Sequence, residues 1–231
     1  MSRIVLTTVG SFGDLHPKIA LALELRRRGH EAVFATHGEY RHKIEQLGFA
    51  FHAIRPDASA LGDPLEMARL MHPYRGQERV IRHWLLPRLE ETFADLLQCA
   101  GTADLIVSGE GVFAARLVAE KLGIPWVCTV LQPLSFLSVH EPLIIPGLSL
   151  TRVWAKLQQL SLPVWLGHSG PVRKVQRELI KAVTSRWSAP VARLRARIGL
   201  PPLTGNLFVD DKYSPWLVLA LFSRVFAKPQ P

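Results

Sequence analysis

The sequence predicts an α/β fold in which helices cover both faces of a doubly wound, mostly parallel sheet. Short apolar runs rich in β-branched residues recur along the chain, as expected for strands that are buried on both faces. Segments with apolar residues at helical spacing separate these runs, and this alternation is typical of right-handed strand–helix–strand crossovers. With 231 residues, 48% of them hydrophobic and 20% charged, the chain can bury a substantial globular core.

The first strand–helix–strand unit shows the pattern most clearly. Residues 4–9 form a continuous apolar run that predicts a buried strand, and a glycine-bearing turn follows at residues 10–14. Pro17 is expected as the first residue of the next helix, because its missing N–H costs nothing there. Gly29 is expected to end this helix, and residues 32–36 form the next predicted strand.

The alternation continues beyond this unit. Further strands are expected at 49–54, 105–107 and 126–130, and a last buried strand at 216–222. Further helices are expected over 40–47, 77–99, 112–122, 172–187 and 190–199. Residues 131–170, rich in proline and apolar side chains, interrupt the rhythm. They fit a packed connection or an apolar ligand-facing segment, and long irregular loops in compact domains favour the second.

The positive charge is concentrated in the last third of the chain. Residues 1–150 hold 15 Lys/Arg and 16 Asp/Glu, whereas residues 151–231 hold 13 Lys/Arg and only 3 Asp/Glu. Such a face attracts nucleic acid, an anionic membrane or a phosphate-bearing ligand, unless it is simply a solvated helical surface. Aromatic residues are not interleaved with the basic residues of 173–197, so we expect no nucleic-acid partner.

The composition also bears on compartment and metal content. Cys99 and Cys128 lie far apart without metal or redox spacing, which predicts buried thiols in a reducing compartment. The histidines show no ligand spacing, so no metal is expected. No stretch resembles a signal peptide or a membrane span. We therefore expect a cytoplasmic protein whose membrane association is limited to peripheral contact at the anionic inner face.

The turn after the first strand is the expected site, because ligands of open parallel sheets bind beyond the carboxyl ends of the strands. Gly10 and Gly13 let a ligand approach the backbone closely, and the following helix offers N–H groups to a phosphate. Their spacing is not that of a dinucleotide fingerprint, and the second strand ends at Thr36-His37 without an acid for a ribose. A nicotinamide cofactor is therefore not expected.

The residues from Gly10 to Pro17 (Gly-Ser-Phe-Gly-Asp-Leu-His-Pro), with Ile19–Leu25 and Arg28-Gly29-His30 after them, resemble the opening of family 28 and related nucleotide-sugar glycosyltransferases. These relatives have the GT-B fold and include sterol, rhamnolipid and glycopeptide-antibiotic transferases. Ala119–Pro125 and Leu219–Ser223 extend the resemblance along essentially the whole chain, and residues 131–200 carry it least.

This resemblance implies half of a GT-B architecture. Residues 1–226 would form the Rossmann-like acceptor-binding domain, residues 227–231 would begin an interdomain linker, and the C-terminal nucleotide-sugar domain would be absent. The implied activity is inverting transfer of a hexosyl group from a UDP- or dTDP-sugar to a hydroxyl of a lipid, sterol or secondary metabolite, with no cofactor. This half alone is expected to be inactive. The alternative is a non-catalytic or split-enzyme subunit that needs a separate donor-domain chain.

The resemblance also assigns the chemistry. Related transferases place the catalytic base three residues before the loop proline, which here is Asp14. Its alternative role is to stabilise the first turn of the helix. His16 is the second candidate base, unless it caps the helix or lines the acceptor pocket. Glu110, after the strand at 105–107, would reach the same sheet edge to orient the base or bind an acceptor hydroxyl, unless it is a solvated loop residue.

The remaining assignments concern the two substrates. Loop side chains that could face the acceptor are Ser11, Phe12, His72, Gln132 and Phe136. The backbone positions expected to admit the donor phosphates are Gly10 and Gly13.

Overall fold

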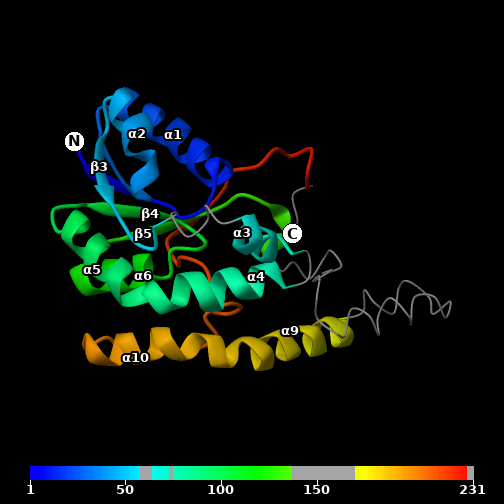
Figure 1. Cartoon of the computed structure of the whole chain (residues 1–231). Coiled ribbons are helices and arrows are strands. Elements are labelled where there is room, and N and C mark those ends of the chain that lie inside the picture. Colours follow the sequence, from blue (N-terminus) through cyan, green and yellow to red (C-terminus); the bar gives the residue numbers. More distant parts are fainter. Residues whose placement is uncertain (58–63, 73–74, 137–169, 228–231) are drawn as a thin grey trace.

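A computed structural model describes residues 1–57, 64–72, 75–136 and 170–227. These residues form a six-stranded sheet in which all neighbouring strands are parallel, in the order β3-β2-β1-β4-β5-β6 (Figure 1). The strands are β1 (Arg3–Thr7), β2 (Glu31–Thr36), β3 (Ala50–Ala53), β4 (Leu105–Gly109), β5 (Trp126–Val130) and β6 (Leu217–Ala220). The doubly wound α/β class expected from the sequence is confirmed.

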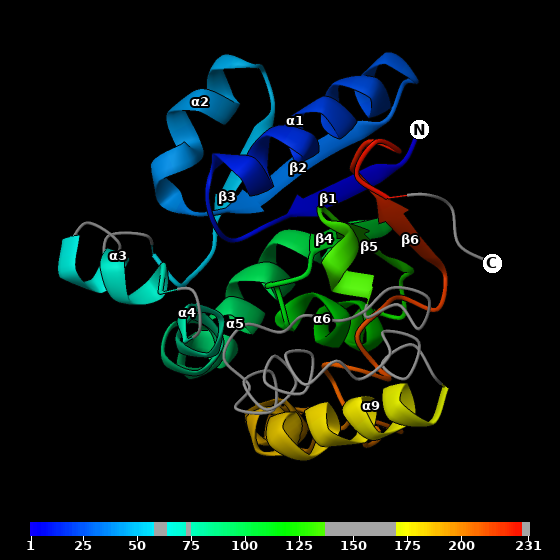
Figure 2. The ribbon, with the colours of Figure 1, turned by 90° about the vertical axis from the view of Figure 1, so that its right-hand side faces the viewer.

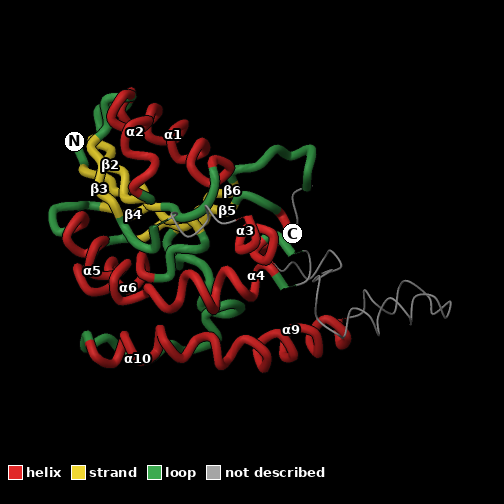
Figure 3. The backbone as a smooth tube through the Cα atoms, in the orientation of Figure 1, coloured by secondary structure: helices red, strands yellow, loops and turns green. Residues whose placement is uncertain are grey.

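Helices cover both faces of the sheet, so that the strands form the middle layer (Figure 3). One face carries α1 (Phe12–Arg27) and α2 (Arg41–Gln46), which is entered through the 3-10 turn η1 (Gly38–Tyr40). The other face carries α5 (Leu89–Ala100) and α6 (Ala114–Leu122), and α9 (Gly170–Thr184) and α10 (Ala189–Arg197) lie beyond them (Figure 1). The shorter elements are α3 (Pro64–Leu70), α4 (Gly76–Arg79), η3 (Val80–Leu85), η4 (Leu86–Arg88), η5 (Pro133–Phe136) and η6 (Ser185–Ser188). No helix within the described ranges has the length and apolar character needed to cross a bilayer.

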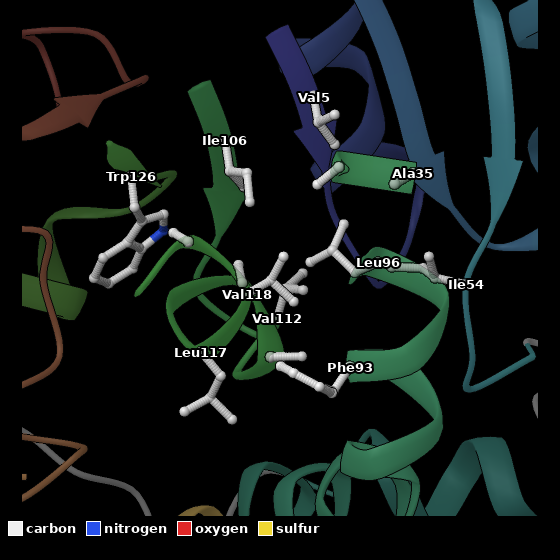
Figure 4. Packing of buried hydrophobic residues seen from close by; sticks show 14 of the residues in the cluster. Val5, Ala35, Ile54, Phe93, Leu96, Ile106, Val112, Leu117, Val118 and Trp126 are labelled. Atoms are coloured by element: carbon white, nitrogen blue, oxygen red, sulfur yellow. The ribbon is translucent and has the colours of Figure 1, made fainter. Parts of the chain in front are cut away.

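The core follows the two-residue period of the strands. In β1, Ile4 and Leu6 pack toward α1 and α2, whereas Val5 packs toward α5 and α6. Figure 4 shows this second cluster, in which Val5 and Ile106 of the sheet lie opposite Leu96 of α5. Full burial of one such side chain contributes about 1.5–3 kcal/mol. Burial on both faces explains why β1 is apolar throughout and does not alternate.

Cys99 and Cys128 are buried free thiols within this core, as expected from the sequence. Burial raises the pKa of Cys99 to about 11, so this group stays a neutral thiol near neutral pH. Both cysteines behave as small apolar side chains.

The start of α1 differs from the expectation. The helix begins at Phe12 with Ser11 as its N-cap, so Pro17 lies inside the helix and His16 does not cap it. Both expectations were wrong because they placed the helix start at the proline. Ser11 and Asp14 instead form a capping box, which satisfies the first backbone donors a turn and a half earlier.

Two apolar segments also behave differently from their patterns. The helix expected over 77–99 is divided into four successive elements, α4, η3, η4 and α5. Pro87, which lacks a backbone donor, lies in η4, just before α5 begins.

The C-terminal strand forms as expected, but it is not buried, because β6 lies at the edge of the sheet beside β5 alone (Figure 2). Trp216 is 74% exposed and Leu217 is 50% exposed. A run of apolar residues does not reveal whether a strand is central or at an edge.

Candidate active site

The strand order reverses between β1 and β4, and ligands of open parallel sheets bind beyond the carboxyl ends of the strands at such a point. The loop after β1 leads through Gly10 into α1 and carries Asp14, and the loop after β4 begins with Glu110. Two expected site residues that are 96 positions apart in the sequence therefore reach the same edge of the sheet.

Asp14 closes the first turn of α1. Its Oδ2 accepts hydrogen bonds from the backbone N–H of Ser11 at 2.8 Å and from the Ser11 hydroxyl at 3.3 Å. The Ser11 Oγ in turn accepts from the N–H of Gly13 at 3.2 Å. The helix-stabilising role considered for Asp14 is therefore present. Among the residues that the structure describes, Oδ1 of this half-buried carboxylate accepts no hydrogen bond, so it remains able to accept one from a substrate.

Gly10 is required by the way Asp14 folds back over it. Its φ of +128° is one that residues with a side chain rarely adopt. A Cβ at this position would come within 2.8 Å of the carboxyl carbon of Asp14. The observed position of the Asp14 carboxylate therefore requires glycine at position 10.

Three backbone donors of this turn are already engaged. The N–H of Gly10 donates to Nε2 of His37, that of Ser11 to Asp14, and that of Gly13 to the Ser11 hydroxyl. A donor phosphate that approaches Gly10 and Gly13 would meet these satisfied amides. The assignment of the two glycines to the donor stays a prediction.

His37 and Tyr40 were not identified from the sequence, although both contact the turn. His37 at the end of β2 is fully buried, and the Tyr40 hydroxyl donates to the carbonyl of Gly10 at 2.8 Å. The sequence signal for His37 is its position directly after a buried strand, at the edge of the sheet where ligands bind.

Lys18 is the second residue that sequence reasoning missed. Its side chain is 1% exposed, and its ε-ammonium group donates to the hydroxyl of Thr129 at the end of β5. Burial lowers the pKa of Lys18 to about 8, and the nearby carboxylates of Asp14 and Glu110 oppose this shift. The buried ammonium group therefore interacts electrostatically with both candidate catalytic carboxylates. The sequence held a signal, because Lys18 interrupts an apolar stripe with Leu15, Ile19 and Ala22 at helical spacing.

Glu110 is tied to the C-terminal segment. Its carboxylate pairs with the ammonium group of Lys212 at 2.8 Å, and Lys212 also donates to the carbonyl of Ser135 at 2.7 Å. The Tyr213 hydroxyl donates to the same carbonyl, and burial raises the pKa of Tyr213. Within the described ranges no hydrogen bond joins Glu110 to Asp14, and each of the two carboxylates interacts electrostatically with Lys18.

Two aromatic groups flank this edge of the sheet. Phe12 is 52% exposed and stacks on His16 with ring centroids 5.3 Å apart. Phe136 packs against Tyr213 at 5.6 Å and against Phe222 at 6.1 Å. Both phenylalanines were expected to contact the acceptor. Phe12 begins the helix that follows β1, and Phe136 ends the 3-10 turn η5 that follows β5.

Of the other expected acceptor residues, Ser11 contacts Asp14 directly, whereas within the described ranges no hydrogen bond joins Gln132 or His72 to Asp14. Ser11 is the exposed N-cap of α1, and Gln132 is exposed directly after β5. His72 follows α3, and its Nδ1 accepts from the N–H of Arg75 at 3.2 Å. Most of the apolar segment expected to face the acceptor, residues 137–169, lies outside the described residues.

A small apolar cavity lies beneath the loops after β1 and β4. It measures about 10 Å³, which is room for about one water molecule. Its lining residues are Val9, Pro56, Leu85, Leu89, Thr92, Gly111, Phe113 and Ala114. Ligand pockets usually measure about 300–1,000 Å³, so this cavity by itself does not hold an acceptor. Among the described residues, no three His, Cys, Asp or Glu side chains are grouped so that they could hold a metal ion.

Comparisons with known proteins find relatives among glycosyltransferases. The chain is 32% identical over 139 residues to a sterol 3-beta-glucosyltransferase of Glomerella lagenarium, a match that covers 57% of this chain and 9% of that protein. It is 26% identical over 233 residues to the glycosyltransferase GtfE of Amycolatopsis orientalis, covering 99% of this chain and 51% of GtfE. The chain thus spans at most about half the length of these relatives.

Solved structures show the same fold. The Streptomyces sp. SF2575 glycosyltransferase SsfS6 matches 90% of this chain and 49% of its own, with a TM-score of 0.52 and 19% identity. The calicheamicin glycosyltransferase CalG4 matches 87% of this chain and 43% of its own, with a TM-score of 0.53 and 16% identity. The family described as "Glycosyltransferase family 28 N-terminal domain" matches residues 4–136, more than half of the sequence. The chain therefore belongs to glycosyltransferase family 28 and carries the N-terminal domain of that family.

Proposed function

We propose that this chain is the acceptor-binding half of an inverting glycosyltransferase that transfers a hexosyl group from a UDP- or dTDP-sugar to a hydroxyl of a lipophilic acceptor. The observation that carries the proposal is the placement of Asp14: it stands at the switch point of the sheet, with one carboxylate oxygen in the helix cap and the other unengaged. The sterol glucosyltransferase relatives favour a lipid, sterol or similar secondary metabolite as the acceptor.

In the proposed reaction, the acceptor hydroxyl oxygen attacks the anomeric carbon while the bond from that carbon to the diphosphate breaks. Asp14 takes the hydroxyl proton, and the nucleoside diphosphate leaves with the electron pair of the broken bond. General-base catalysis of this kind contributes about 10²–10⁴-fold. The nucleotide-sugar is a co-substrate in this scheme, and neither a cofactor nor a metal takes part.

The acceptor side would be formed by the aromatic groups on either side of Asp14. Phe12 and Phe136 offer apolar area, while Ser11 and Gln132 offer polar contacts to a hydroxyl. The ion pair with Lys212 would hold the Glu110 carboxylate at the same edge of the sheet. The nucleotide-sugar would be bound by a further domain of the kind that the family resemblance implies.

A chimera tests the proposal directly. This chain would be joined to the part of GtfE that it does not match, because 99% of the chain aligns with 51% of that relative. We expect the chimera to transfer labelled glucose from UDP- or dTDP-glucose to a sterol or a long-chain alcohol, and the 231-residue chain alone to bind the acceptor without transfer. Transfer by the isolated chain would contradict the division of roles, and no transfer by a folded chimera that binds both substrates would contradict the proposed function.

One observation favours the alternative of a split enzyme with a separate donor-domain chain. Among the described residues, large apolar side chains are exposed just before β6, at its start and after it: Trp216, Leu217, Val225 and Phe226. Monomeric proteins rarely expose contiguous apolar patches of several hundred Å². Mixing the chain with a separately produced donor domain distinguishes the two cases, because only a split enzyme regains transfer without a covalent link.

We also propose a peripheral contact between the basic C-terminal third and an anionic membrane, from which a lipophilic acceptor would be collected. A cluster of cations near such a surface contributes about 1 kcal/mol per charge.

A further inference from the structure

The glycine turn is held from outside by two side chains that the proposed chemistry does not use. We infer that His37 and Tyr40 are positioning residues, which fix the peptide groups on both sides of Gly10 and thereby the carboxylate of Asp14. The clamp follows from the contacts of the chain itself, and only its consequence for sugar transfer rests on the proposed function.

A single peptide group connects Tyr40 to Asp14. The Tyr40 hydroxyl donates to the carbonyl oxygen of Gly10 at 2.8 Å. The N–H of that same peptide group belongs to Ser11, and it donates to Oδ2 of Asp14 at 2.8 Å. Because a peptide group is planar, it cannot turn without disturbing both hydrogen bonds. The orientation of the Asp14 carboxylate is therefore tied to the Tyr40 hydroxyl.

The preceding peptide group is held by His37. The N–H of Gly10 donates to Nε2 of the ring at 3.0 Å. A backbone N–H can only donate, so Nε2 must be unprotonated, and the proton of the neutral ring lies on Nδ1. That Nδ1–H donates to the carbonyl of Pro56 at 2.7 Å. Both ring nitrogens are thus engaged, and the tautomer is set by its two partners.

The turn needs such external support because its conformation is unusual. Gly10 has a φ of +128°, in a region that glycine visits as one of several alternatives. His37 has no exposed surface and Tyr40 is 6% exposed, so neither side chain is placed to touch a substrate. The ring of Tyr40 also packs against Phe12, with centroids 5.2 Å apart, so removal of the hydroxyl alone isolates the path through Gly10.

Of the two anchors, only His37 gains a charge on acidification. Burial lowers the pKa of His37, and the groups that oppose this shift are the Pro56 carbonyl and the acids Glu39, Asp57 and Asp14. The ring of Trp84 covers the imidazole, with centroids 5.4 Å apart. Burial raises the pKa of Tyr40 to about 12, so its hydroxyl remains a donor.

Protonation of His37 would open the clamp. A proton on Nε2 would face the N–H of Gly10, donor against donor, and the hydrogen bond would be lost. The clamp should therefore be closed while the imidazole is neutral and should open on acidification. Its midpoint should lie below about 6.5, the ordinary pKa of histidine.

Nuclear magnetic resonance of the ¹⁵N-labelled 231-residue chain between pH 4.5 and 8 tests the clamp without any substrate. We expect the His37 ring to show a protonated Nδ1 and an unprotonated Nε2 near neutral pH. The amide signals of Gly10 and Ser11 should titrate with the same midpoint as His37. His52→Gln, a half-buried histidine on β3, is the matched control and should leave this titration unchanged. A Gly10 amide that does not follow His37 would overturn the inference.

Two variants of His37 separate the acceptor role from packing. His37→Gln can present an amide oxygen near the position of Nε2, so it should keep the Gly10 amide protected but abolish the acid titration. His37→Phe keeps a ring without an acceptor, and Tyr40→Phe removes only the hydroxyl. Each should speed exchange of the Gly10 or Ser11 amide about 3- to 10-fold, the range of one neutral hydrogen bond. Unchanged exchange in a folded His37→Phe or Tyr40→Phe chain would overturn the clamp.

The consequence for catalysis is tested in the chimera described above. His37→Phe and Tyr40→Phe should lower kcat about 10-fold or more with little change in acceptor KM, and His37→Gln should restore most of the loss. If the amides respond but kcat does not, the positioning role is wrong and the proposed function stands. If the unsubstituted chimera transfers no sugar, the proposed function fails while the clamp is still judged by its amide signals.

Discussion

Lys18 and Thr129 are joined by a hydrogen bond from the ε-ammonium group to the hydroxyl, between α1 and the end of β5 and away from water. The Thr129 hydroxyl donates its own hydrogen bond to the carbonyl of Ser108 at 3.0 Å, so its oxygen can accept one from Lys18. This contact places a lysine where the period of α1 calls for an apolar residue. Two carboxylates, Asp14 and Glu110, compensate part of the cost of burying its charge.

The buried lysine predicts how stability depends on pH. The pKa of Lys18 is about 8 in the folded chain and 10.5 in its unperturbed state, so between these values the unfolded chain binds more protons. The free energy of unfolding should therefore rise with pH across this window, by up to about 3 kcal/mol from this group. Below pH 8 the folded state carries the full cost of the buried ammonium group.

Lys18→Met isolates this contribution. The variant should be more stable than the natural chain at pH 7 by about 1–3 kcal/mol, and the difference should vanish toward pH 10. Urea unfolding at pH 7, 8, 9 and 10 measures it. Lys121→Met, which changes an exposed lysine, should show no such pH-dependent difference. A difference between natural chain and Lys18→Met that stays constant with pH would contradict the assignment.

Gly10→Ala should displace the candidate base. The new Cβ would come within 2.8 Å of the Asp14 carboxyl carbon, and the φ of +128° is strained for alanine. We expect a loss of about 1–3 kcal/mol in the free energy of unfolding. Gly13→Ala is the matched control, because a Cβ there meets only the Ser11 hydroxyl at 3.4 Å and the residue is helical.

A double variant separates the steric part of this loss from the backbone part. In an Asp14→Ala background the clash is removed, so Gly10→Ala should cost less than in the natural chain. Equal costs in the two backgrounds would show that backbone strain alone is responsible and that Asp14 does not press on position 10.

Asp14→Asn should abolish most of the sugar transfer while leaving the fold intact. The amide oxygen of asparagine can still accept from the Ser11 N–H, so the helix cap is retained. Because asparagine does not accept the hydroxyl proton, kcat of the chimera should fall about 10²- to 10⁴-fold with little change in acceptor affinity. If His16→Ala proves the more damaging substitution, the base has been assigned to the wrong residue.

The comparison of sequence and structure shows which features a local pattern can reveal. The strands β1 and β2 and the turn at Gly10 were predictable, because continuous apolar runs and a glycine between strand and helix are local signals. The exposure of β6 was not, because it depends on which neighbours a strand acquires in the sheet. The roles of Lys18 and His37 could not be predicted for a related reason. Their roles arise from contacts with Thr129 and Gly10, which lie 111 and 27 residues away in the sequence.

The charge pattern of the last third shows the same limit. The sequence predicts a strongly basic face, yet the structure pairs much of this charge. Arg177 and Lys181 both bind Asp210, at 2.7 and 3.1 Å, and the buried Arg195 binds Glu120 at 2.7 Å. Arg186 and Arg193 are exposed and make no ion pair within the described ranges. The charge that is free to meet a membrane is therefore smaller than the sequence count suggests.

This difference sharpens the membrane prediction. The chain should bind weakly to vesicles that contain phosphatidylserine and should not bind to neutral phosphatidylcholine vesicles, and the binding should be lost at high salt because salt screens exposed charges. Replacing Arg186 and Arg193 together by glutamine should weaken binding about 5-fold or more per charge, since each contributes about 1 kcal/mol near the surface. Arg177→Gln, at an exposed but paired position, should have a smaller effect. Sedimentation with both kinds of vesicle at low and high salt measures these differences. Equal pelleting with neutral vesicles, or a double variant that binds as well as the natural chain, would leave Arg186 and Arg193 as ordinary solvated surface residues.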